Sequence, residues 1–177
     1  LDFAVSVVTG GGYKQPHTGE RADVEALVAW HPDPRAVVAL GGYDGRLGDE
    51  SDAAHTLQHT ARRIDLLAAW ADRAWRFGVR YSYGSNWANL YTVPGDRVRS
   101  ISTWASRQLT PQWSVFARCD YTWPSRLQDP SRRGRYADTG VEWRPQKGLR
   151  LALVGKHTAA WRQGVPLATT NELGVWS

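Results

Sequence analysis

The sequence predicts an all-β fold, an up-and-down antiparallel transmembrane β-barrel of about ten strands that takes up residues 1–177 as a single domain. Three observations predict it. Short turns alternate with longer polar segments along the chain, and the stretches between them alternate between polar and apolar residues. Six of the ten tryptophans lie beside a short turn or the C-terminus, as in an aromatic girdle. These six are Trp30, Trp70, Trp75, Trp113, Trp143 and Trp176.

The connections between strands have two lengths. The short turns are His31 to Arg35, Asp72-Arg73, Pro111-Gln112 and Pro145 to Gly148. The longer segments are rich in Gly, Pro, Asp or Arg, as loops are; they are Tyr13 to Arg21, Asp44 to Thr56, Asn86 to Asp96, Pro124 to Arg135 and Thr158 to Pro166. Short turns at one end and long loops at the other are typical of a barrel that spans a membrane.

The segments between these connections give the ten expected strands. They are residues 1–12, 22–31, 36–44, 57–71, 74–86, 97–109, 113–123, 136–144, 149–157 and 167–177. An even number of strands places both ends of the chain on the side of the short turns.

Alternation within the strands predicts one apolar and one polar face, because successive side chains of a strand point to opposite sides. In 113–123 the apolar set is Trp113, Val115, Ala117, Cys119, Tyr121 and Trp123. In 74–86 it is Trp75, Phe77, Val79, Tyr81 and Tyr83, and in 22–31 it is Val24, Ala26, Val28 and Trp30. The faces of 97–109 cannot be assigned, since Ser100, Ser102 and Ser106 alternate in phase with Trp104 while Ile101 is in phase with Arg99 and Arg107.

Two hairpins suggest a strand register. A tight turn at Asp72-Arg73 would place Trp70 opposite Trp75 and Asp65 opposite Arg80. A turn centred on Gln146 would place Glu142 opposite Arg150 and Val141 opposite Leu151. In both hairpins an apolar residue meets an apolar one and an acid meets a base.

Composition limits the alternatives. The mean hydropathy is -0.49, which fits a barrel with a polar lumen. The sequence contains no run of 18 apolar residues, so it predicts no transmembrane helix. The chain has no Met and no signal peptide, which indicates a mature or excised segment. The single Cys119 forms no intrachain disulfide, and its expected lipid-facing position makes it inert.

The soluble alternatives are a lipocalin-like barrel and a propeller. A propeller blade of similar period holds four short strands, whereas here each repeat holds two strands of about ten residues, which is the length that crosses a bilayer. A lipocalin carries its apolar residues inside. Here the second face carries charges of both signs, and exposing the Trp-rich face to water would create a large apolar surface.

These patterns make the chain resemble the outer-membrane β-barrel proteins of Gram-negative bacteria as a class. The resemblance extends over nearly the whole length and implies an integral outer-membrane location in contact with lipid and lipopolysaccharide. Members usually end on an aromatic residue, and this chain ends one residue after Trp176. In a larger protein of this class, a periplasmic module would precede Leu1.

The polar face supplies the candidate lumen-lining residues. They are Arg63, Asp65, Arg76, Arg80, Arg118, Asp120, Glu142, Arg150 and Lys156. Their signs nearly balance, and a ten-stranded barrel is only slightly wider than one that side chains can fill, so a network of ion pairs is favoured over a wide selective pore. A basic cluster in an expected outer loop could hold lipopolysaccharide phosphates or be a solvated loop; its members are Arg126, Arg132, Arg133 and Arg135.

The predicted function is that of the transport or porin-like class, which passes small or polymeric polar solutes across the outer membrane; this follows by analogy with the fold. One alternative is a closed barrel that acts as a surface receptor, adhesin or anchor through its outer loops. A second is a lipid- or peptide-hydrolysing enzyme, although the chain contains no familiar hydrolase motif.

No cofactor, metal or nucleic acid is expected. His55 and His59 have a spacing that chelates a metal on a helix, but they begin an expected strand, where this spacing does not converge. The net charge of +5 is spread over alternating positions rather than clustered, so it does not indicate a nucleic-acid partner.

Overall fold

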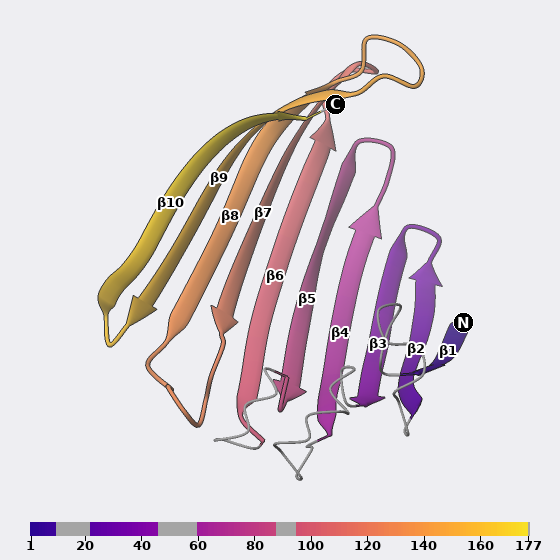
Figure 1. The fold of residues 1–177 in the computed structure, drawn as a ribbon. Coiled ribbons are helices and arrows are strands. Elements are labelled where there is room, and N and C mark those ends of the chain that lie inside the picture. Colours follow the sequence, from indigo (N-terminus) through magenta and orange to yellow (C-terminus); the bar gives the residue numbers. More distant parts are fainter. Residues whose placement is uncertain (10–21, 46–59, 88–94, 177) are drawn as a thin grey trace.

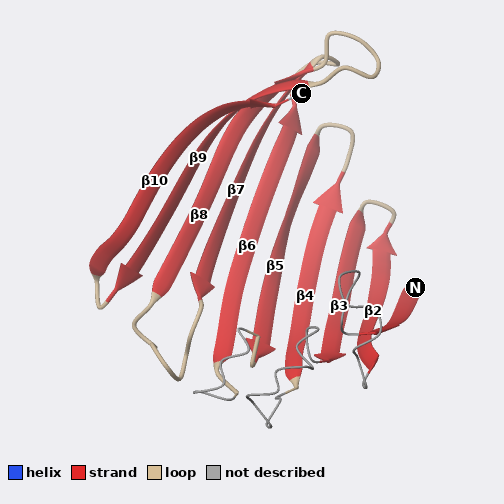
Figure 2. Ribbon diagram, viewed as in Figure 1, coloured by secondary structure: helices blue, strands red, loops and turns tan. Residues whose placement is uncertain are grey.

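A computed structural model describes residues 1–9, 22–45, 60–87 and 95–176, which form one antiparallel sheet of ten strands in chain order (Figure 1). The strands are β1 (Asp2–Thr9), β2 (Ala22–Asp33), β3 (Ala36–Gly45), β4 (Ala61–Ala71), β5 (Trp75–Ser85), β6 (Arg97–Gln108), β7 (Trp113–Trp123), β8 (Arg133–Trp143), β9 (Leu151–Arg162) and β10 (Val165–Trp176). The predicted all-β, up-and-down arrangement is confirmed. Figure 2 shows strands and loops only in the described ranges, with no helix among them.

The sheet is not closed. Within the described residues, β1 pairs only with β2, and β10 pairs only with β9. The sheet curls, yet β1 and β10 lie at its opposite margins (Figure 1). The structure therefore contains two free sheet edges.

The last hairpin differs from the sequence-based expectation. Residues 158–166 were expected to form a long loop, but β9 continues to Arg162 and β10 begins at Val165. Gln163 and Gly164 connect them with φ angles of 52° and 80°, the pair of positive values that a two-residue type I′ turn requires. The loop prediction was wrong because it rested on the Arg, Gly and Pro content of 158–166; the register shifts next to Pro166, where a bulge on an edge strand tolerates the proline.

The hairpin of β4 and β5 is in a different register from the predicted one. Trp70 lies opposite Phe77 and Asp65 opposite Ser82, so the predicted partners Trp75 and Arg80 were wrong by two residues. The reason is the turn: a carboxylate oxygen of Asp72 accepts hydrogen bonds from the backbone N–H groups of residues 74 and 75, at 2.7 and 2.6 Å, and lengthens the connection.

The hairpin of β8 and β9 shows the same shift of two residues. Glu142 lies opposite Ala152 and Val141 opposite Leu153, while Arg150 precedes β9. The predicted pairing of Glu142 with Arg150 was therefore wrong. Because side chains alternate with a period of two, a shift of two keeps each residue on its predicted face.

The sheet has one apolar and one polar face, as the alternation predicts. A register row on the apolar face runs through Phe3, Val28, Leu40, Leu66, Tyr81, Ile101 and Tyr121. The neighbouring row on the polar face runs through Leu27, Gly41, Asp65, Ser82, Ser100 and Thr122. The register also settles β6: Ile101 belongs to the apolar face, and Ser102 and Trp104 belong to the polar face.

The described part of the sheet has no hydrophobic core in which a large side chain is fully buried. Phe3 is 80% exposed and Leu173 is 77% exposed, both on edge strands, and Leu66 in the interior of the sheet is 50% exposed. The accessible surface is 11963 Å², whereas a soluble globular protein of this mass is expected to have about 8,600 Å². Among the residues that the structure describes, no layer therefore covers the apolar face.

Candidate functional site

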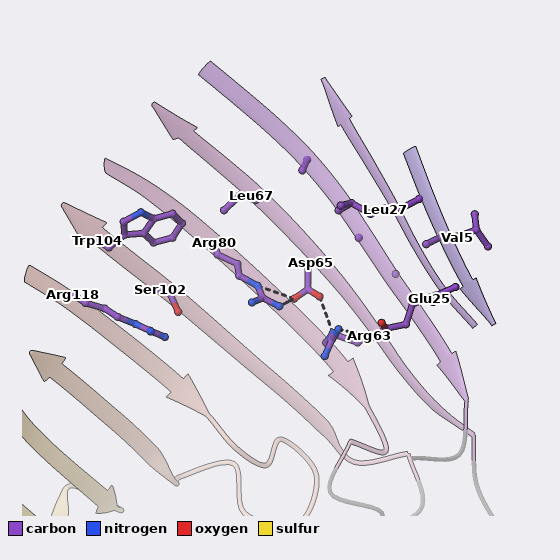
Figure 3. Close-up of a pocket in the computed structure, with 16 residues that line it drawn as sticks. Val5, Glu25, Leu27, Arg63, Asp65, Leu67, Arg80, Ser102, Trp104 and Arg118 are labelled. Carbon is purple, nitrogen blue, oxygen red and sulfur yellow. Dashed lines mark hydrogen bonds and ion pairs between the residues drawn. The ribbon is translucent and has the colours of Figure 1, made fainter. Parts of the chain in front are cut away.

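A groove of about 660 Å³ crosses the polar face of the sheet (Figure 3). Side chains from β1 to β7 line it, so strands far apart in the sequence contribute to one site. Its charged and aromatic residues are Glu25, Arg63, Asp65, Arg80, Trp104 and Arg118. Four of the predicted lumen-lining residues thus come together: Arg63, Asp65, Arg80 and Arg118.

Asp65 is the centre of the groove's ion-pair network. Nε of Arg63 lies 2.7 Å from one carboxylate oxygen, and Nη2 of Arg80 lies 2.8 Å from the other. The hydroxyl of Ser82 donates to that second oxygen at 2.5 Å. The predicted Asp65–Arg80 pair therefore forms diagonally, because a long side chain reaches the diagonal neighbour across a strand pair.

Glu25 in the groove and Asp120 beside it also contact arginines. Glu25 accepts a hydrogen bond from Arg63 at 3.3 Å. Asp120 lies beside Arg118 on the same strand and face, with contacts of 2.9 and 3.0 Å to its guanidinium. Asp120 lines an adjoining hollow of about 300 Å³ together with Arg63, Arg80 and Arg118. The groove as a whole therefore carries both signs in contact with each other.

Two tryptophans that the sequence alone did not single out border the groove. A Cβ atom on Gly78 would lie 2.4 Å from the ring of Trp104, so the indole lies flat against the β5 backbone. Trp104 is directly opposite Gly78 in register, and glycine makes this close approach possible. Trp87 lines the smaller hollow, with the guanidinium of Arg63 at 4.7 Å from its ring centroid.

The remaining predicted lumen-lining residues lie outside the groove. Arg76 is exposed near the turn end of β5, and Arg150 is exposed outside the strands. Glu142 forms an ion pair with Arg144, and Lys156 lies 4.5 Å from the ring centroid of Trp176. Across β7 to β10 a register row instead alternates in charge through Arg118, Asp138, Lys156 and Glu172.

The tryptophans near the short turns lie on the apolar face with one exception. Trp30, Trp70, Trp75, Trp113 and Trp143 share this face. Trp113 stacks on Trp143 with ring centroids 5.8 Å apart. Trp176 lies on the opposite face, against Lys156, so it does not extend the expected girdle.

A second set of aromatic side chains lies at the loop end of the apolar face. Tyr121 packs against Trp123 at 4.8 Å, and arginines approach the rings of Trp123 and Trp161 at 5.7 and 5.8 Å. β7 begins at Trp113 and ends at Trp123. At about 3.3 Å per residue the backbones of these two tryptophans are about 33 Å apart along the strand. A strand of this length, tilted by about 40° as in an outer-membrane barrel, would span about 25 Å, which is the height of that barrel's apolar band.

Asp96 joins two loops at the same end of the sheet. Its carboxylate accepts hydrogen bonds from the backbone N–H groups of Arg97, Arg126 and Leu127 at 2.8 to 2.9 Å. Burial raises the pKa of Asp96, but the hydrogen bonds from Ser125 and these three backbone amides outweigh burial and place the pKa below the usual value of an aspartate. The ionised form of Asp96 thus holds the loop after β7 against the start of β6.

The four arginines of the expected basic loop do not all lie in a loop. Arg126 and Arg132 precede β8, whereas Arg133 and Arg135 belong to it, because β8 begins three residues earlier than expected. Arg133 donates to the backbone carbonyls of residues 130 and 132. Arg135 lies over Trp161. Two of the four side chains therefore already have protein partners.

The described histidines lie away from the groove. His31 contacts Asp2 at 2.9 Å, and His157 contacts Asn171 at 2.8 Å. His17, His55 and His59 fall outside the described residues. Within the described ranges no group of His, Cys, Asp or Glu has the geometry of a metal site, and no helix there is long and apolar enough to cross a membrane.

Comparison of the chain with protein-family models, with curated proteins and with solved structures found no match.

Proposed function

We propose that this chain is an integral outer-membrane β-barrel of the transport or porin-like class, which passes small or polymeric polar solutes across the outer membrane. The apolar face contacts lipid and lipopolysaccharide, and the polar face with its groove lines the lumen. The observation that supports this function best is the two-faced sheet with aromatic residues at both ends of its apolar face. In water, a face this apolar and this exposed would drive aggregation.

Membrane insertion requires both sheet edges to be covered, because a bilayer offers no water to unpaired backbone N–H and C=O groups. In the proposed barrel β1 pairs with β10. The ten-stranded meander makes these two strands antiparallel, so direct pairing is possible. Five triple variants test it, each with Cys119→Ser, Val5→Cys and one cysteine on β10 at position 167, 169, 171, 173 or 175. We expect one or two of them to form an intramolecular disulfide after refolding into vesicles. Disulfides that form only between molecules would contradict closure within one chain.

Conduction is tested in a planar bilayer with the refolded chain. We expect discrete conductance steps in KCl. Insertion is verified separately with the natural Cys119, which is exposed on the apolar face: lipid should protect it from a charged, water-soluble maleimide that labels it after denaturation. Labelling at the rate of a free thiol in vesicles would contradict the lipid-facing assignment.

The closed barrel with a receptor or anchoring role is the second candidate. The contacts of Asp65 and Asp120 with arginines favour it, since ion pairs of this kind can fill a narrow lumen. It predicts a silent bilayer together with a protected Cys119, whereas the transport proposal predicts steps together with a protected Cys119.

A further inference from the structure

We infer that the polar groove binds a neutral polyhydroxylated solute, of the carbohydrate class, rather than an inorganic ion. This inference rests on the proposed transport function and names the substrate class of the same site. It is carried by three properties of the groove: balanced charge, adjacent donors and acceptors, and indole surfaces.

Charge balance disfavours a simple ion as ligand. The two hollows, which share part of their lining, are lined by three acids and three arginines, and each acid contacts at least one guanidinium. The fields of the two signs oppose each other, so neither an anion nor a cation gains the electrostatic attraction that a cluster of one sign provides. A ligand without net charge loses nothing from this arrangement.

The hydrogen-bonding groups suit hydroxyls. A hydroxyl both donates and accepts, so it fits a site where guanidinium N–H groups and carboxylate oxygens lie side by side. The side chains of Arg80 and Arg118 are 46% and 51% exposed although they contact acids, so part of each guanidinium faces the groove. In register, Ser102 lies opposite Arg80 on one side and Asp120 on the other, and Ser100 extends this row of small polar groups along β6.

The tryptophans supply the apolar surface that the C–H face of a sugar ring requires. Trp104 lies flat on Gly78, so one indole face is against the sheet and the other faces the groove (Figure 3). Trp87 lines the adjoining hollow. Such amphipathic rings combine a large contact area with few rotatable bonds. The groove thus provides stacking surfaces together with a polar floor.

The test is equilibrium binding of maltohexaose and of inorganic phosphate to the refolded full chain in detergent. Titration calorimetry and tryptophan fluorescence measure this binding. We expect saturable binding of maltohexaose, with little dependence on KCl because screening acts on charged ligands. Trp104→Leu should weaken this binding at least about fivefold, in line with about 1 kcal/mol for an aromatic contact. Trp143→Leu makes the same change on the apolar face and should leave the affinity unaltered.

A second measurement keeps Trp104 in place. In a Ser102→Cys, Cys119→Ser chain, maltohexaose should slow the reaction of the groove cysteine with a maleimide, and phosphate should not. Salt-sensitive phosphate binding that exceeds maltohexaose binding would overturn the inference in favour of an anion site. Equal affinities of Trp104→Leu and Trp143→Leu, or no saturable maltohexaose binding, would also overturn it. Because these measurements need no conduction, a silent bilayer with sugar binding contradicts only the transport function.

Discussion

The two faces of the sheet share one backbone but differ in how their side chains are stabilised. On the polar face, charged side chains find partners within the chain: the side chain of Asp65 is only 14% exposed and contacts two arginines. On the apolar face, side chains such as Leu66 and Leu40 remain about half exposed and find no covering layer. The charged groups of the polar face pair with one another, whereas the apolar side chains of the other face have no such partners among the described residues. In the described ranges no protein core stabilises the apolar side of this fold, and under the proposed function lipid takes that role.

The largest expected effect comes from placing the same charge on either face. Leu66 and Leu67 are neighbours in β4, but Leu66 lies in the apolar row and Leu67 lines the groove. Leu66→Arg should lower the free energy of unfolding in lipid by about 2–4 kcal/mol, the cost of an arginine near the bilayer midplane. Leu67→Arg should cost much less. Urea titration of both variants in vesicles measures the difference, and equal losses would contradict the assignment of the faces.

A smaller effect is expected from removing a carboxylate of the polar face. Asp65→Asn leaves Arg63 and Arg80 without their shared partner and should cost about 1–2 kcal/mol, below the about 3–5 kcal/mol of a fully buried pair because water reaches the groove. The control is Asp44→Asn, which removes an acid that is 41% exposed and contacts Arg62; we expect at most about 1 kcal/mol there. The same urea titration compares them, and a larger loss for Asp44→Asn would contradict the network's role.

The smallest effect concerns the loop that Asp96 holds. Since hydrogen bonds place the folded-state pKa of Asp96 below the ordinary value of 3.8, its stabilisation is present above that value and is lost as the pH falls through the lower pKa. A spin label at Gln128→Cys, with Cys119→Ser, should be more mobile in Asp96→Asn than in the parent at pH 7. This difference should vanish in strong acid. Asp72→Asn, at the opposite end of the sheet, should leave the label unchanged; a pH-independent difference would contradict the linkage.

Most of the fold could be predicted from the sequence because period-two alternation and turn residues are local signals. The bounds of 113–123 coincide with β7, and the predicted faces of Trp75, Phe77 and Val79 agree with the register. The registers of two hairpins were wrong by two residues, because the number of residues in a turn depends on hydrogen bonds such as those of Asp72. The β9–β10 turn was missed because Gln163 adopts a positive φ, which is uncommon for glutamine and therefore not predictable from its residue type.

The candidate site was predicted only in part. The charges Arg63, Asp65, Arg80 and Arg118 could be placed on one face from alternation alone. The roles of Trp87 and Trp104 could not, because a contact between Trp104 and Gly78 depends on the register of β5 against β6. The faces of β6 could not be assigned from the sequence, because its serines carry little hydropathy contrast.

The sequence by itself determined which residues form strands and which side each residue takes, since both follow from interactions between near neighbours and from a backbone with two faces. The tertiary structure decided which charges meet and where an indole can lie on a glycine. Those outcomes depend on strand register and curvature, which arise only when all ten strands lie side by side.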